Sequence, residues 1–337
     1  MTVQYAPTSP GSDTSHAVVE TVAGTIPVSA LGTTLMHEHL FVTSEEIRLN
    51  NPGGWDEEKE VAAAIERARA MTDRGVNTMV DLTVYGLGRN IARIARVNAA
   101  VPELNIVAAT GLYTYDGLPF PFIYQGPGSL MGGDEPMVQM FTSDIRDGIA
   151  GTGIKAAVLK CALENELTPG VERVLRAVAE THKRTGTPIT VHTNPTAKTG
   201  LVAQRILAEE GVDPGRVVIG HSGDTTDLDY LDALIAGGTY LGMDRFGLDF
   251  LLPSDQRVAT VAALAERGYA DRMVLSHDAS CHIDWLPPGA KEQLAPNWHH
   301  TYLHDEVIPA LLKAGVTQEQ LDTMLISNPR RYFTPAG

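Results

Sequence analysis

Side chains that could bind metal ions gather at the ends of short β-rich runs of the sequence. The chain holds eleven histidines. Imidazole, amine and carboxylate groups that meet at one place can ligate divalent cations and activate water for hydrolysis. Five of the histidines, with one lysine and one aspartate, lie at or near the carboxyl ends of such runs: His37, His39, Lys160, His192, His221, His277 and Asp278.

The first run carries His37-Glu38-His39. Side chains alternate along a strand, so both imidazoles should face inward and Glu38 outward. An isolated pair of this kind would more often be solvated, and the further ligand-type groups favour a metal site instead. A carboxylate buried at Asp278 is costly unless it meets a cation or charged hydrogen bonds. By the same alternation, the neighbouring His277 should point away from the pocket.

Each of His192 and His221 follows an apolar run, and either one taken alone reads as a core histidine. Together they offer a second pair of ligand nitrogens. Lys160 lies in AAVLKCA, which would bury its amine. At about 4 Å and an effective dielectric near 20, a divalent ion would disfavour the ammonium by about 8 kcal/mol, or roughly six pKa units. A neutral amine could add carbon dioxide and bridge two metals as a carbamate. The alternative is an ion pair with a nearby carboxylate.

Strand-like and helix-like segments alternate from residue 31 onward. Helical periodicity is expected over 58–72, 170–184, 199–210 and 256–267. Alternation of this kind predicts a parallel sheet, and eight units predict a (β/α)8 TIM barrel. An open doubly wound sheet is the rival, but no glycine-rich phosphate loop begins a helix. The expected strands span 33–39, 76–83, 105–112, 154–161, 188–194, 216–222, 239–245 and 273–278.

The two ends of the chain differ from this rhythm. Residues 1–16 are rich in Ser, Thr, Pro and Gly and are expected to form a flexible tail. Residues 18–30 predict a small hairpin over one end of the barrel. Residues 317–328 predict an extra C-terminal helix stopped by Asn328-Pro329. We therefore expect a single metal-dependent hydrolase domain over 17–335.

Composition excludes several classes of partner. Lys and Arg number 26 against 41 Asp and Glu, which gives a formal net charge of −15. This charge argues against nucleic acid and against an anionic membrane surface. No apolar run is long enough to cross a bilayer, and the first thirty residues lack the pattern of a secretory signal. The two cysteines, Cys161 and Cys281, form no disulfide framework, so a cytoplasmic location is expected.

These residues together resemble the phosphotriesterase family of the amidohydrolase superfamily. The strings LMHEHL, RILAEEGVDP, VVIGHSGDT, LGMDRFGLD, SHDASCHIDW and NPRRYF look like its lactonase branch, and the similarity runs from about Gly24 to Phe333. The resemblance implies two divalent ions, whose identity (zinc, cobalt, iron or manganese) stays open, and a homodimer. It implies that His37, His39 and Asp278 hold one ion and His192 and His221 the other, with carboxylated Lys160 and a hydroxide between them.

The same resemblance assigns residues to the substrate site. Tyr113, Arg245 and Trp285 would line it, and the apolar loop that begins at Phe246 would hold a lipophilic tail. Asp278 would act as general base and acid, and Asp224 either relays the proton outward or caps the next helix. The expected activity is hydrolysis of lactones, with N-acyl homoserine lactones as the expected class and organophosphate triesters as side substrates. The alternatives are a dedicated phosphotriesterase (aryldialkylphosphatase) or a carboxylesterase.

Overall fold

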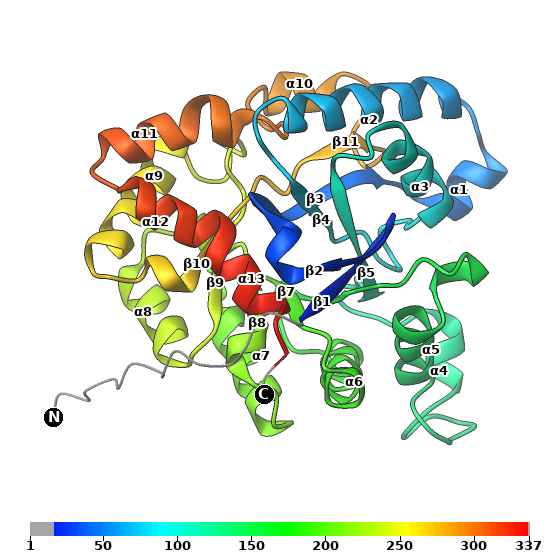
Figure 1. Cartoon of the computed structure of the whole chain (residues 1–337). Helices are drawn as coiled ribbons and strands as arrows, with labels where there is room; N and C mark the ends of the chain where they lie inside the picture. The colour runs from blue at the N-terminus through cyan, green and yellow to red at the C-terminus, as the bar shows by residue number, and fades with distance from the viewer. Residues whose placement is uncertain (1–16, 336–337) are drawn as a thin grey trace, which may run out of the picture.

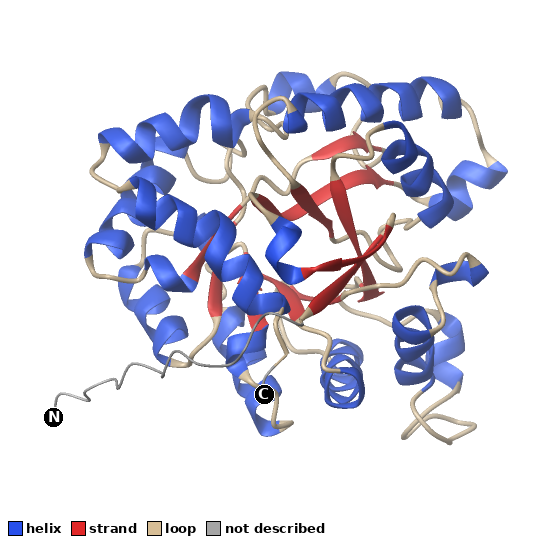
Figure 2. Cartoon of the chain, in the orientation of Figure 1, coloured by secondary structure: helices blue, strands red, loops and turns tan. Residues whose placement is uncertain are grey.

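The computed structural model describes residues 17–335, and the predicted tail over 1–16 lies outside them. One parallel sheet curls into a barrel, and helices surround it, as Figure 1 shows. Figure 2 shows the strands at the centre with helices around them. The prediction of a (β/α)8-type barrel is confirmed. In sheet order the strands are β10 (Met273–Leu275), β9 (Tyr240–Met243), β8 (Val217–Gly220), β7 (Ile189–Thr193), β6 (Val158–Leu163), β5 (Asn105–Leu112), β4 (Thr78–Asp81), β3 (Thr34–Val42) and β11 (Ser280–Ile283).

The helices that cover this sheet bury their apolar faces against it. The segment predicted over 170–184 forms α6, which starts after the Thr168 cap and ends at Gly186 in the left-handed conformation. Val171, Val174 and Val178 of its inner face are fully buried. The helices are α1 (Glu45–Asn50), α2 (Glu57–Thr72), α3 (Ile91–Ala100), α4 (Phe120–Tyr124), α5 (Pro136–Arg146), α6 (Pro169–Thr185), α7 (Thr199–Glu209), α8 (Leu228–Ala236), α9 (Ser254–Glu266), α10 (Ala290–Leu294), α11 (Ile308–Lys313), α12 (Gln318–Asp322) and α13 (Asn328–Phe333).

The predicted N-terminal hairpin is present. Strands β1 (Val18–Thr21) and β2 (Gly24–Pro27) pair antiparallel around a short turn. The backbone amide of Val22, just after β1, donates to the Ile106 carbonyl of β5 at 2.8 Å, which attaches the hairpin to the barrel. Val19 is buried with barrel residues in a second apolar cluster. The hairpin therefore covers the end of the barrel at which the strands begin.

The last barrel strand differs from the uniform strand predicted over 273–278. Strand β10 ends at Leu275, and residues 276–279 form an irregular link that hydrogen-bonds to β3. The Asp278 amide donates to the His37 carbonyl at 2.9 Å, and the His39 amide donates to the Ala279 carbonyl at 2.8 Å. The chain then continues as β11, parallel to β3. Asp278 has a φ of 54°, an unusual value for a residue other than glycine.

The C-terminal helix extends further than predicted. The stop expected at Asn328-Pro329 is wrong, because α12 continues through a π-helical turn, Thr323–Ser327, into α13. Pro329 is tolerated because it occupies the first turn of α13 after the wider π turn. Tyr332 and Phe333 are buried against the barrel, which favours extension of the helix. Within the part that the structure describes, no helix is long and apolar enough to cross a membrane.

Candidate metal centre

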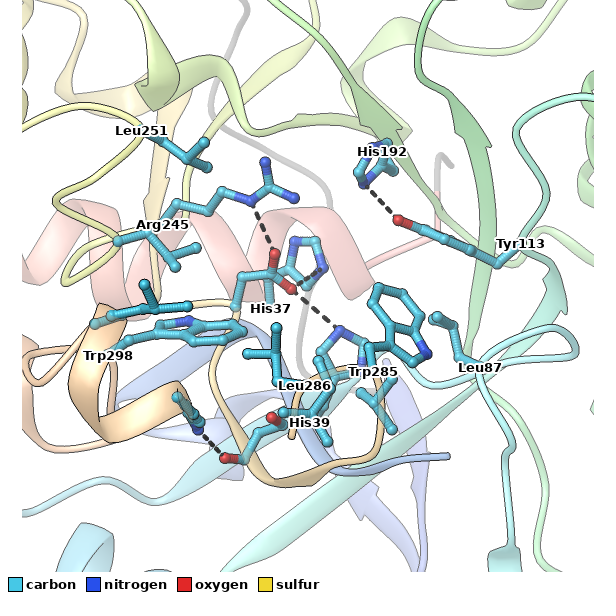
Figure 3. Close-up of a pocket in the computed structure, with 18 of the residues that line it drawn as sticks. His37, His39, Leu87, Tyr113, His192, Arg245, Leu251, Trp285, Leu286 and Trp298 are labelled. Atoms are coloured by element: carbon cyan, nitrogen blue, oxygen red, sulfur yellow. Dashed lines mark hydrogen bonds and ion pairs between the residues drawn. The ribbon is translucent and has the colours of Figure 1, made fainter. Parts of the chain in front are cut away.

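The predicted ligands meet at the carboxyl ends of the strands. His37 and His39 lie on β3, Lys160 on β6 and His192 on β7, while His221 follows β8 directly. The irregular link after β10 brings in Asp278. All but His221 line one pocket, part of which Figure 3 shows. His221 is fully buried behind the pocket wall. Residues that are distant in the sequence therefore form one cluster at the face where barrels of this kind carry their active sites.

The first group in this cluster is His37, His39 and Asp278. One ligand atom from each lies within 4.8 Å of the others. Asp278 Oδ1 is 3.2 Å from His39 Nε2 and 3.3 Å from His37 Nε2. Burial alone would raise the pKa of Asp278, but two neighbouring histidines and Arg245 hold it well below its usual value. Asp278 is thus an anionic group that faces two imidazoles.

The second group is His192 and His221. The Nδ1 atom of His192 lies 2.8 Å from the Nε2 atom of His221. Burial lowers the pKa of His192 to about 4 and that of His221 well below its usual value. Both rings are therefore neutral at pH 7, which is the form that can ligate a metal.

One carboxylate and one hydroxyl behind the rings fix which nitrogen of each imidazole faces the site. Asp244 Oδ2 lies 2.7 Å from His37 Nδ1, and Asp244 Oδ1 lies 3.0 Å from His221 Nδ1. Thr83 Oγ1 lies 2.8 Å from His39 Nδ1. Such partners orient imidazole ligands and set their tautomers. The three Nε2 atoms are therefore the ones presented to the site.

Lys160 lies at the centre of the cluster. Its Nζ atom is 3.1 Å from His37 Nε2, and the side chain is fully buried. Burial lowers the pKa of Lys160 to about 8. No carboxylate of the described residues lies within 4.0 Å of this amine, so the ion-pair alternative is not seen. Four imidazoles, a carboxylate and a readily neutralised amine converge, and this donor set fits two divalent cations.

A chain of ion pairs leads away from Asp278. Arg245 Nε donates to Asp278 Oδ2 at 2.9 Å, and its NH1 donates to Asp224 Oδ2 at 2.9 Å. The other oxygen of Asp224 accepts from Arg257 at 2.5 Å. The helix α8 is capped by Asp227, so Asp224 does not cap it. Asp224 holds two arginines and lies outside the main pocket.

The predicted substrate residues divide between pocket and core. Tyr113, Arg245 and Trp285 line the pocket, and the Tyr113 hydroxyl lies 3.3 Å from His192 Nδ1. Phe246 does not line it: this side chain is 1% exposed and packs in the main hydrophobic core. Phe246 lies in the loop that follows β9, which ends at Met243, so strand alternation did not determine where its side chain points. The apolar residues next along the chain, Leu248, Phe250 and Leu251, do line the pocket.

A second buried cluster lies on the outer side of β3, where alternation places Glu38. Its Oε1 atom accepts from Ser276 Oγ at 2.8 Å and lies 2.6 Å from His277 Nδ1, and its Oε2 atom accepts from the Ala279 amide at 3.0 Å. His277 therefore points away from the pocket, as predicted. Glu38 fixes the irregular link that carries Asp278.

Sequence reasoning missed several residues of the site. Asp244, Glu164 and Tyr115 are absent from the predicted set. Glu164 Oε2 lies 2.5 Å from His192 Nε2, and Tyr115 lines the pocket beside Tyr113. A signal existed for Asp244, because it directly follows β9 at the same end of the barrel as the predicted ligands. Glu164 comes from the loop after β6, where no spacing rule applies.

The fold and the clustered imidazole, amine and carboxylate groups define a metal-dependent hydrolase. A family model described as the phosphotriesterase family matches residues 17–333. The chain belongs to the phosphotriesterase family. It is 59% identical over 321 residues to the phosphotriesterase homology protein of Mycobacterium tuberculosis, which covers 95% of this chain and 98% of that relative. It is 41% identical over 307 residues to an aryldialkylphosphatase of Saccharolobus solfataricus, covering 90% and 95%.

Solved structures agree with this assignment. The structure of the phosphotriesterase from Mycobacterium tuberculosis superposes with a TM-score of 0.92, at 59% identity, covering 94% of this chain and 98% of that one. The organophosphorus hydrolase from Deinococcus radiodurans superposes with a TM-score of 0.86, at 33% identity, covering 96% and 100%. The family and its barrel are therefore shown by sequence and by structure.

Proposed function

We propose that the protein opens lactones that carry a lipophilic acyl tail, with N-acyl homoserine lactones as the substrate class. One observation carries this proposal: a single pocket joins the polar cluster to an extended apolar wall. About 970 Å³ of this pocket is free of protein atoms, part of it open to solvent. The polar cluster suits a lactone ring, and the apolar wall suits a chain attached to that ring. The wall consists of Leu87, Leu248, Phe250, Leu251, Trp285, Leu286, Leu294 and Trp298.

Two divalent ions at the cluster would supply electrophilic polarisation of the substrate and a nucleophilic water at neutral pH. We propose that His37, His39 and Asp278 hold one ion and that His192 and His221 hold the other. Lys160 would join them after its amine adds carbon dioxide, forming a C–N bond and releasing one proton. The lowered pKa of Lys160, about 8, supports this step because a neutral amine is required.

The protein's own residues would handle the proton and the leaving group. Asp278 lies in the pocket as an anion and would take a proton from the attacking water, then return it to the leaving oxygen. Burial raises the pKa of Tyr113, so its phenol keeps its proton and can donate to the substrate.

Arg245 would hold Asp278 in place, and Asp224 would act by positioning Arg245. An outward proton relay from Asp278 to Asp224 would pass through Arg245, a side chain that does not deprotonate in proteins. We therefore assign Asp224 a positioning role.

A panel of lactones and organophosphate triesters tests the substrate class. We expect kcat/KM for acyl lactones to exceed that for triesters and to rise with acyl-chain length as the apolar wall is filled. Triester turnover with no lactone turnover would instead favour a dedicated phosphotriesterase, which the names of the relatives make the second candidate.

Metal removal and restoration test the role of Lys160. Activity should vanish on chelation and should return more fully when divalent metal is added with bicarbonate than with metal alone. Equal recovery with and without bicarbonate would contradict carboxylation.

The homodimer and the cytoplasmic location stay predictions. Size-exclusion chromatography with light scattering would test the homodimer.

A further inference from the structure

Glu164 contacts His192 on the side of the ring that faces away from the proposed ions. It directly follows β6, the strand that carries Lys160, and its Oε2 atom lies 2.5 Å from His192 Nε2. Its Oε1 atom accepts from the side-chain amide of Asn194 at 3.3 Å. The hydrogen bond with His192 holds the pKa of Glu164 below its usual value, so the carboxylate is anionic at pH 7. Because an anion accepts but cannot donate, the proton of the neutral ring belongs on Nε2.

The other nitrogen of His192 faces the site. Its Nδ1 atom lies 2.8 Å from His221 Nε2 and 3.3 Å from the hydroxyl of Tyr113, which Figure 3 shows beside His192. Asp244 holds His221 in the same manner, since its Oδ1 atom lies 3.0 Å from Nδ1 of that ring. Both rings therefore carry their protons on the outer nitrogens and present two bare nitrogens to each other. One carboxylate stands at each outer end of this imidazole pair.

The two carboxylates differ in exposure. The side chain of Asp244 is 1% exposed, whereas that of Glu164 is 25% exposed and lines a smaller pocket beside the main one. Arg245 and Leu251 line both pockets and therefore separate them. A substitution at Glu164 leaves neither a sealed cavity nor an unpaired charge in the core, so we expect such variants to fold.

We propose that Glu164 is a positioning residue that keeps the imidazoles of His192 and His221 open to a metal ion. Without its carboxylate, the proton of His192 can move to Nδ1 and be donated to His221 Nε2, which already lies within hydrogen-bond distance. The two rings would then satisfy each other, and neither would offer a lone pair to an ion. Glu164 itself holds the opposite nitrogen of the ring, so it acts through His192. This inference rests on the proposed two-ion centre for its ion and on side-chain geometry for the tautomer.

Nuclear magnetic resonance on the metal-free protein tests the tautomer without reference to metal or activity. Long-range proton–nitrogen correlation spectra at pH 7 distinguish a protonated ring nitrogen from a bare one, and His192→Asn identifies the signals. We expect the proton on Nε2 of His192 in the wild type and on Nδ1 in Glu164→Leu. Glu164→Gln should give a mixture, because an amide can either accept or donate. A proton that stays on Nε2 in Glu164→Leu would overturn the proposal.

Metal affinity tests the consequence of the tautomer. Competition between the protein and a chelator of known affinity, with zinc as the probe, should resolve two ions in the wild type. In Glu164→Leu one ion should bind about 10–100-fold more weakly, the usual cost of losing the partner of a ligating imidazole, and the other should change far less. Glu166→Leu, an exposed position two residues further along the same loop, is the matched control and should bind both ions as the wild type does.

The comparison of two affinities separates positioning from a general folding role, because a folding defect would weaken both ions alike. Equal losses for both ions in Glu164→Leu, or no loss for either, would overturn the proposal. If the wild type binds fewer than two ions, the proposed two-ion centre fails, and the tautomer of His192 still decides the role of Glu164.

Discussion

Strand β3 separates two buried clusters built from the same residue types. On its inner face His37 and His39 meet Asp278, with an amine and two further imidazoles nearby. On its outer face Glu38 meets His277 and His300, and each carboxylate oxygen accepts hydrogen bonds. The outer cluster is closed, because His277 Nε2 also accepts from the Leu303 amide at 2.8 Å. The inner cluster presents its ring nitrogens to an open pocket.

This difference separates a structural site from a chemical one. Closed clusters satisfy their polar atoms internally and stabilise the fold. In the inner cluster, the neutral rings of His192 and His221 direct nitrogen lone pairs at each other across 2.8 Å, beside an open pocket. A bound group such as a cation is needed to satisfy both lone pairs. Glu38 links the two, since it holds the turn from which Asp278 enters the pocket.

Loss of the inner carboxylate should have the largest effect. Asp278→Asn removes an anionic ligand and the proposed general base, and we expect kcat to fall about 10³-fold or more. Steady-state kinetics with saturating metal measures it. Asp227→Asn, at the N-cap of α8, is the control and should retain nearly full activity. A loss below tenfold in Asp278→Asn would remove this residue from the chemistry.

Loss of the outer carboxylate should act first on stability. Glu38→Gln sets an amide NH₂ against a donor, and we expect unfolding free energy to fall by about 3 kcal/mol. Chemical denaturation of the metal-free protein measures this loss. If the variant is as stable as the wild type but loses activity, the two faces are not divided as argued.

Asp244 tests how far the inner cluster depends on its backing residues. Asp244→Asn still occupies the space but presents an amide to His37 and His221, so metal affinity should fall by about 10–100-fold. Competition with a chelator of known affinity measures it. Wild-type affinity in this variant would show that the carboxylate orients neither ring.

The pocket wall should give the smallest effect. Trp285 is 51% exposed and packs near Tyr113, with ring centres 6.3 Å apart. Trp285→Ala should raise KM for long-chain lactones by about three- to tenfold and change short-chain substrates less. A uniform loss across chain lengths would place Trp285 in the chemistry instead of the tail site.

The periodic features of the sequence predicted more of the molecule than its irregular ones. Alternation along β3 predicted which of His37, Glu38 and His39 face inward, and the helix pattern of α6 matched within one residue at each end. The break after Leu275 followed no sequence pattern. It depends on hydrogen bonds that Glu38 accepts from the amides of His277 and Ala279, which lie 239 and 241 positions further along the chain. The position of Asp244 directly after β9 was a usable signal, but its role of orienting His37 and His221 depends on contacts between different strands that the sequence does not show.

Metal content per chain tests the central claim most directly. Mass spectrometry of the purified protein after dialysis should give about two divalent ions per chain in the wild type and fewer in His192→Ala and His39→Ala, while His277→Asn on the outer face keeps two. Full hydrolytic activity in protein that contains no bound metal, or two ions retained after loss of the inner histidines, would contradict the account.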